Sequence, residues 1–112
     1  MSEFRLDNYL RMHRKRADLS QAEVAFLLGL ENGSDVSRHE QNRRVPSLDA
    51  ALAYEVILGQ PVVELFAGRI ERLARRLSSP ASRLAERIDP NDPNLAAKLA
   101  SLTRIANRFP LA

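Results

Sequence analysis

Apolar residues recur every three to four positions in several stretches of the chain, which is the spacing that places side chains on one face of an α-helix. The first stretch predicts a helix from about Glu3 to Ala17. No stretch alternates apolar and polar residues long enough to predict a strand, so we expect an all-α fold. The stripe residues are Phe4, Leu6, Tyr9, Leu10 and His13 in the first helix, Val24, Leu27 and Leu28 in a second, and Leu48, Ala51, Leu52, Tyr54 and Ile57 in a later one.

Capping residues mark where several of these helices begin and end. Ser20, with Glu23 three residues later, is a capping box and predicts the start of the second helix. Gly29 predicts its left-handed end. Ser47 predicts the start of the helix over residues 48–58, and Gly59 its end.

A short polar helix is expected between these two. Either Asn32 or Ser34 can cap it, and it runs to about Gln41. Ser34 and Arg38 are four residues apart and therefore share a face. Because an arginine can form two hydrogen bonds to a guanine edge, this face could read DNA, and two helices joined by a short glycine-containing turn are typical of a helix-turn-helix. The alternative is a short connecting helix with a solvated face.

The C-terminal part predicts further helices. Pro61 is placed as the first residue of a fifth helix, which the apolar positions Phe66, Ile70, Leu73 and Leu77 would extend. Ser79-Pro80 and Asp92-Pro93 repeat a cap-then-proline signal and predict two more helix starts. The last helix carries a narrow apolar stripe, which either folds back onto the chain's own helical domain or packs on the same segment of a second chain. That stripe consists of Leu95, Leu99, Leu102, Ala106 and Phe109.

Charge is distributed unevenly along the 112 residues. The net charge is +3 and the pI about 9.9. Up to Phe66 there are 8 Lys or Arg and 10 Asp or Glu, a net charge of −2, whereas the rest has 9 against 4, a net charge of +5. Any binding of nucleic acid by the first part must therefore depend on a few placed residues rather than on bulk charge.

Composition and motifs narrow the function further. The chain has no cysteine, so it has no disulfide and no thiolate metal site. No apolar run approaches the roughly 18 residues of a membrane span, and the N-terminus has no signal-peptide core. We expect a cytoplasmic protein that has no membrane partner and no cofactor or metal. No nucleophile elbow, glycine-rich loop or metal-ligand spacing is present, so we expect no enzymatic activity.

The stretch "LSQAEVAFLLGL" followed by "VSRHEQNRRVPSLDAALAYEVILGQPVVELF" resembles the Xre/Cro family of phage-repressor-type DNA-binding domains. The resemblance covers about residues 5–66. It implies a five-helix helix-turn-helix domain over residues 1–66 that binds double-stranded DNA. The resemblance does not cover residues 67–112, which we expect from their apolar stripes to form a helical extension and dimerisation region.

The resemblance also implies roles for individual residues. An ion pair is expected between Arg14 and Glu40. Asn42 stands where the family has a glycine, and asparagine tolerates left-handed geometry. His39 stands at a usually apolar position, as a half-buried core histidine, a phosphate contact or a pH-sensitive packing residue. The expected base contacts are Gly33, Ser34 and Arg38, and the expected phosphate contacts are Gln21, Asn32, Ser37, Gln41, Arg43 and Arg44.

These observations together predict a sequence-specific regulator of transcription, a repressor acting as a homodimer on a palindromic operator. The dimer interface would be formed by Leu95, Leu99, Leu102 and Phe109. The alternative is a regulator that binds other proteins, such as an antitoxin or anti-activator, and the negative charge of the first part keeps it open.

Overall fold

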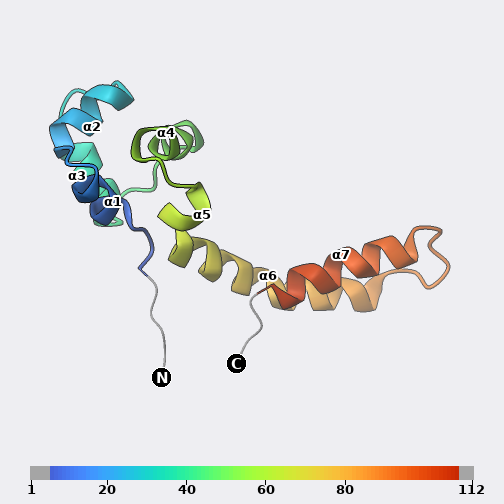
Figure 1. The fold of residues 1–112 in the computed structure, drawn as a ribbon. Helices are drawn as coiled ribbons and strands as arrows, with labels where there is room; N and C mark the ends of the chain where they lie inside the picture. Colours follow the sequence, from blue (N-terminus) through green and yellow to red (C-terminus); the bar gives the residue numbers. More distant parts are fainter. Residues whose placement is uncertain (1–5, 109–112) are drawn as a thin grey trace. The chain divides into compact units, whose positions relative to one another are not determined.

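The computed structural model describes residues 6–108, and within them every regular element is a helix (Figure 1). The all-α prediction is confirmed. The described part contains seven helices: α1 (Leu10–Arg16), α2 (Gln21–Leu28), α3 (Ser34–Glu40), α4 (Leu48–Leu58), α5 (Val62–Leu65), α6 (Ala67–Arg87) and α7 (Leu95–Asn107).

The chain divides into two compact units, residues 1–69 and residues 70–112. We call the first unit the head and the second the tail. The head contains α1 to α5 and the first residues of α6, and its helices enclose one apolar core. That core consists of Leu10, Val24, Ala25, Val36, Tyr54, Leu58, Leu65 and Phe66.

The predicted caps of α2 and α4 are confirmed. The Ser20 hydroxyl accepts a hydrogen bond from the Glu23 amide at 3.0 Å, and the Glu23 carboxylate accepts one from the Ser20 amide at 2.8 Å. Gly29 ends α2 with a φ of 78°, and Gly59 ends α4 with a φ of 69°. The Ser47 hydroxyl accepts from the Ala50 amide at 3.1 Å and so caps α4.

The first helix was predicted to begin at about Glu3, which lies outside the described residues. Residues 6–9 are described and are not helical, so the predicted start was wrong. α1 begins at Leu10, because one tertiary and one local hydrogen bond hold the preceding residues in another conformation. The Tyr9 amide donates to the Leu65 carbonyl at 2.7 Å, and the Asn8 side chain accepts from the Leu10 amide at 3.1 Å.

Several leucines predicted to face the core are exposed instead. Leu27 is 57 % exposed, Leu48 74 % and Leu52 49 %, while Ala25 is buried. Both α2 and α4 have apolar residues on more than one side, so periodicity alone did not select the buried face.

A continuous extension of the fifth helix past Phe66 was also predicted wrongly. Pro61 precedes α5 as its N-cap, but α5 ends at Leu65. Phe66 leaves helical geometry, with φ −119° and ψ 36°, and buries its ring in the head. α6 begins at the next residue.

The two cap-then-proline signals had different outcomes. Pro80 lies inside α6, and the Ser79 hydroxyl accepts from Arg83 Nη1 at 3.0 Å instead of capping a new helix. The second signal is followed by α7, which begins two residues after Pro93. There the Asp92 carboxylate accepts from the Asn94 amide at 2.7 Å.

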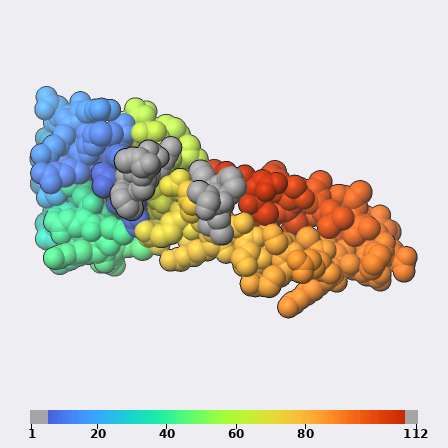
Figure 2. Space-filling model, turned by 90° about the horizontal axis from the view of Figure 1, so that it is seen from below, coloured from blue at the N-terminus to red at the C-terminus, as the bar shows by residue number. Residues whose placement is uncertain are grey.

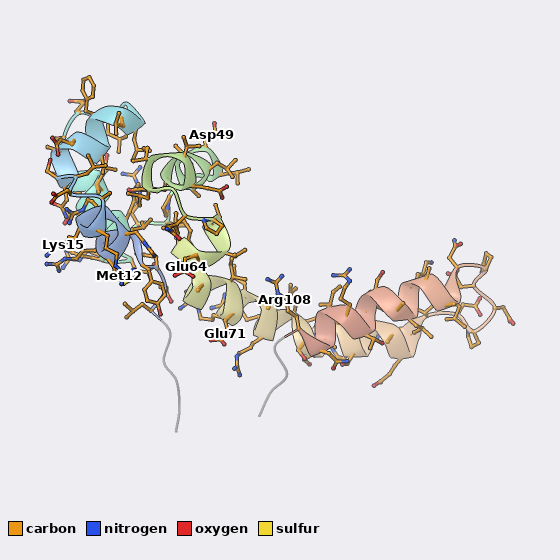
Figure 3. All side chains as sticks on the ribbon, viewed as in Figure 1. Met12, Lys15, Asp49, Glu64, Glu71 and Arg108 are labelled. Atoms are coloured by element: carbon orange, nitrogen blue, oxygen red, sulfur yellow. The ribbon has the colours of Figure 1, made fainter. Side chains whose placement is uncertain are left out.

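In the tail, α6 and α7 lie side by side (Figures 1 and 2), and Figure 3 shows their side chains. The Ser78 hydroxyl donates to the Ala106 carbonyl at 3.2 Å, and Ala81 is buried. Leu95 and Leu102 are half-buried, and Leu99 is 36 % exposed. Phe109, the remaining residue of the expected dimer interface, lies outside the described residues. The stripe of α7 therefore has a neighbour within its own unit.

Candidate nucleic-acid interface

Gly33, the residue directly before α3, lies close to the start of α2. A Cβ atom at Gly33 would lie 3.1 Å from Gln21 Cβ and 3.2 Å from the Ala22 amide nitrogen, both closer than ordinary van der Waals contact. A side chain at position 33 would therefore require its neighbours at the start of α2 to shift by a few tenths of an ångström, whereas the φ of Gly33, −75°, is one that any residue adopts. The Asn32 side chain accepts from the Ser34 amide at 2.8 Å and fixes the turn that precedes α3.

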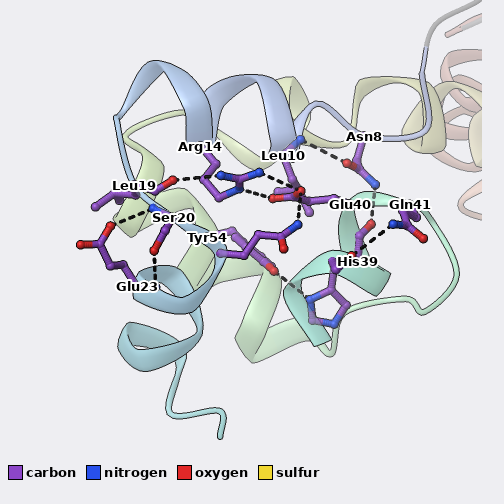
Figure 4. A network of polar contacts seen from close by, with 12 residues as sticks. Asn8, Leu10, Arg14, Leu19, Ser20, Glu23, His39, Glu40, Gln41 and Tyr54 are labelled. Carbon is purple, nitrogen blue, oxygen red and sulfur yellow. Dashed lines mark hydrogen bonds and ion pairs between the residues drawn. The ribbon is translucent and has the colours of Figure 1, made fainter. Parts of the chain in front are cut away.

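A buried polar network joins the first three helices (Figure 4). Arg14 Nε lies 2.5 Å from Glu40 Oε2, and Arg14 Nη2 donates to Glu40 Oε1 at 3.2 Å. Gln21 Nε2 donates to Glu40 Oε1 at 3.0 Å, and Arg14 Nη1 donates to the Leu19 carbonyl at 3.0 Å. The Glu40 side chain is only 4 % exposed. The carboxylate at the end of α3 is therefore held by α1 and α2 together.

The inner face of α3 is held by a second contact. His39 is 6 % exposed, and its Nδ1 lies 2.8 Å from the Tyr54 hydroxyl of α4. Burial lowers the pKa of His39, an effect that Asp35 opposes and Arg44 reinforces. Burial also raises the pKa of Tyr54. The Asn8 side chain donates to the His39 carbonyl at 2.9 Å. His39 is thus a core residue, one of the three interpretations that the sequence allowed.

The outer face of α3 forms one side of a shallow polar hollow. Ser34 and Arg38 are exposed, while Ser37 is half-buried. Seven of the nine residues expected to contact DNA line this hollow. The residues that line the hollow are Gln21, Gly33, Ser34, Ser37, Arg38, Gln41 and Arg43.

The two remaining residues lie elsewhere. Asn32 lines a neighbouring hollow that it shares with Arg38. Arg44 lines a separate groove between α2 and α4, beside His39 and Val45. The neighbouring residues Arg43 and Arg44 therefore face different surfaces.

Asp35 pairs with two of the arginines expected to bind DNA, contacts that were not predicted from the sequence. Its Oδ1 lies 3.0 Å from Arg38 Nη1 and 3.3 Å from Arg44 Nη1. The i, i+3 spacing of Asp35 and Arg38 was a visible signal for the first contact. The second joins residues nine positions apart through the loop after α3.

That loop turns through a left-handed residue. Asn42 has a φ of 59°, the geometry for which asparagine was expected to be tolerated. The side-chain nitrogen of Asn42, Nδ2, also donates to the Asp7 carboxylate. The loop thereby connects the end of α3 to the segment before α1.

Two other kinds of site are not found among residues 6–108. No group of three or more His, Asp or Glu side chains in this part of the chain could hold a metal ion. None of its helices combines the length and the apolar character needed to cross a membrane. Comparison of the chain with family models, curated proteins and solved structures gave no match.

Proposed function

We propose that this protein is a sequence-specific regulator that binds double-stranded DNA through α3. The observation that supports the proposal is the hollow lined by Gln21, Gly33, Ser34, Ser37, Arg38, Gln41 and Arg43, because it gathers small polar groups and two arginines on one face. In such an arrangement the second helix of a helix-turn-helix enters the major groove.

Within this proposal Arg38 reads a base edge. Its guanidinium can form two hydrogen bonds to a guanine, which discriminates against a wrong base by about 1–3 kcal/mol. The contact with Asp35 at 3.0 Å limits the positions that the guanidinium can take before DNA binds. Ser34 and Ser37 are short enough to let the helix backbone approach the groove.

Contacts to phosphate are assigned to Gln21, Gln41 and Arg43, which border the same hollow. Few cations are available, since the residues up to Phe66 have a net charge of −2. The sequence-independent part of the affinity is therefore expected to be small, with a shallow dependence on salt.

The proposal includes action as a homodimeric repressor on a palindromic site, as the resemblance to the Xre/Cro family implies. Two heads would then occupy half-sites about one helical turn apart. Leu95 and Leu102 are half-buried beside α6, so of the described residues expected at the interface Leu99 has the most free surface. Sedimentation equilibrium of the wild-type chain and of Leu99→Glu tests this part separately.

The experiment that tests DNA binding is selection of bound duplexes from a random pool by the full chain. Repeated enrichment of one motif supports the proposal. Arg38→Ala is then expected to weaken binding to that motif by about 1–3 kcal/mol and to relax the choice of base at one position. Arg75→Ala makes the same charge change in the tail, where Arg75 pairs with Glu71, and is expected to leave binding unchanged.

A second candidate, a regulator that binds other proteins through the head, is favoured by exposed apolar side chains on α2 and α4. Phe26 is 81 % exposed, Leu48 74 % and Val56 83 %. Large apolar side chains exposed to solvent are the kind that a protein contact would cover. If the random pool yields no motif and binding is absent at low salt, this candidate replaces the first.

A further inference from the structure

From Arg72 to the residue directly after α6, an arginine directly precedes a large apolar residue four times. The pairs are Arg72-Leu73, Arg76-Leu77, Arg83-Leu84 and Arg87-Ile88, at steps of four, seven and four residues. In an α-helix these steps align the apolar residues in one row. Each arginine is offset from its neighbour by about 100°, so the arginines form a parallel row beside the first.

The apolar row is not covered within the tail. Leu73 is 43 % exposed, Leu77 55 % and Leu84 53 %. α6 instead turns small residues toward α7, since Ala81 is buried and the Ser78 hydroxyl donates to the Ala106 carbonyl. The larger apolar side chains of α6 are therefore left in solvent, and three of them in one row form a patch rather than isolated exposed residues.

The C-terminal end of this row continues into an apolar groove between α6 and α7. The groove is lined by Leu84, Ile88, Ala97, Lys98, Ser101 and Leu102. Lys98 lines the groove on the α7 side, and on α6 the arginine row runs beside the leucines that enter the groove. Lys98 Nζ lies 2.5 Å from the Asp92 carboxylate at the end of the connecting loop.

We propose that this face of the tail, the leucine row with its groove and its bordering cations, binds an acidic amphipathic helix of another protein. A channel between two helices suits a third helix that inserts apolar side chains at a spacing of three to four residues. From Leu73 to Leu84 the row rises by about 16 Å, or three turns of a partner helix. Because Lys98 is already paired with Asp92, the arginine row is the border that selects a partner with carboxylates beside its apolar stripe.

The same charges disfavour a second copy of this face. Residues 70–112 contain 8 Lys or Arg and 4 Asp or Glu, a net charge of +4. In a two-fold pairing of antiparallel helices, equivalent edges meet, so the arginine row of one chain would lie against that of the other. Glu71 is paired with Arg75 at 3.7 Å, on the side of α6 away from the leucines. A bilayer surface is disfavoured because the groove is concave.

The test uses the full chain and two labelled helical peptides that share one leucine spacing. One peptide has glutamates beside the leucines and the other has lysines, and binding is followed by fluorescence anisotropy. We expect the glutamate peptide to bind at least about tenfold more tightly than the lysine peptide. Arg76→Glu/Arg83→Glu is expected to reverse this preference. Leu77→Ala/Leu84→Ala is expected to weaken the binding of the glutamate peptide by about tenfold or more.

Arg75→Glu is the matched control, because it reverses a charge on the opposite side of α6 and should leave the preference unchanged. Circular dichroism checks that each variant keeps its helix content. The proposal is overturned if both peptides bind equally or if the double charge reversal does not change the order. It is also overturned if the chain alone sediments as a dimer that Leu77→Ala/Leu84→Ala dissociates, or if only phosphatidylserine vesicles bind. DNA binding by the head should be the same in all these variants, so this inference and the proposed function fail independently.

Discussion

Replacing Arg14 by methionine should destabilise the head more than any surface substitution. The guanidinium makes two contacts to the Glu40 carboxylate, at 2.5 and 3.2 Å, and one to the Leu19 carbonyl at 3.0 Å. Methionine keeps most of the aliphatic length of arginine but leaves the Glu40 side chain, 4 % exposed, without its counter-ion. One hydrogen bond from Gln21 would remain.

Removing one partner of a buried ion pair costs about 3–5 kcal/mol, because the other charge stays buried and unpaired. A unit of this size is expected to have roughly 3–10 kcal/mol of total stability, at about 0.05–0.15 kcal/mol per residue. The substitution therefore removes a large part of the free energy of unfolding. At about 4–8 °C per kcal/mol, the Tm of the head should fall by at least about 12 °C.

Tyrosine fluorescence can follow this unfolding in the full chain. The chain has two tyrosines and no tryptophan, and Tyr9 and Tyr54 both belong to the head. The matched control is Arg16→Met in the same helix, an exposed residue whose change should stay within about 0.5 kcal/mol.

A double-mutant cycle decides whether the pairing itself is responsible. Arg14→Met/Glu40→Leu removes both charges, and replacing a buried pair by apolar residues is often close to neutral. The double variant should therefore be more stable than Arg14→Met, with a coupling energy of about 3 kcal/mol. A coupling energy near zero would refute the view that this pair joins α1 to α3.

Three further predictions concern other parts of the head. Arg43→Ala should reduce the slope of log affinity for DNA against log salt concentration by about 0.9, because one phosphate contact is lost. Arg44→Ala, which changes a residue outside the hollow, should leave that slope unchanged. Equal slopes for the two variants would contradict the assignment of the phosphate contact to Arg43. Because burial lowers the pKa of His39, the unfolded chain binds more protons than the folded head, and the free energy of unfolding should fall as the pH drops from about 6.5 toward the folded pKa, by at most about 1.4 kcal/mol per pH unit. His39→Gln should remove this pH dependence, which urea titrations at several pH values would measure. An unchanged pH dependence would assign it to another group. Gly33→Ala forces Gln21 to move by a few tenths of an ångström and should cost about 1–3 kcal/mol of stability, measured by thermal melting; no loss would show that α2 and α3 can separate freely.

Features determined by neighbouring residues could be predicted from the sequence. The Ser20–Glu23 capping box and the left-handed Gly29 depend only on side chains within one turn of the helix end. The true start of α1 depends instead on a hydrogen bond from Tyr9 to Leu65, far along the chain. Local propensity contains no information about such a contact.

The same distinction applies to the candidate site. The positions of Ser34 and Arg38 on one face follow from the helical period. Their enclosure in one hollow with Gln21 depends on the close approach at Gly33, which only the folded head provides. The contact of Asp35 with Arg44 likewise required the path of the loop after α3.

The first residues of α6 belong to the head, and this sets where an isolated DNA-binding fragment can end. The Arg69 amide donates to the Asp7 carbonyl at 3.2 Å, and the Arg69 guanidinium lies 3.9 Å from the Asp7 carboxylate, which also accepts from Asn42. A fragment cut after Phe66, at the limit suggested by the resemblance, would lose both contacts from Arg69. For spectroscopy on the head alone, the C-terminus of the fragment should therefore lie at least one helical turn beyond Arg69. The Arg69 amide, which binds the segment before α1 through Asp7, then remains part of a helix.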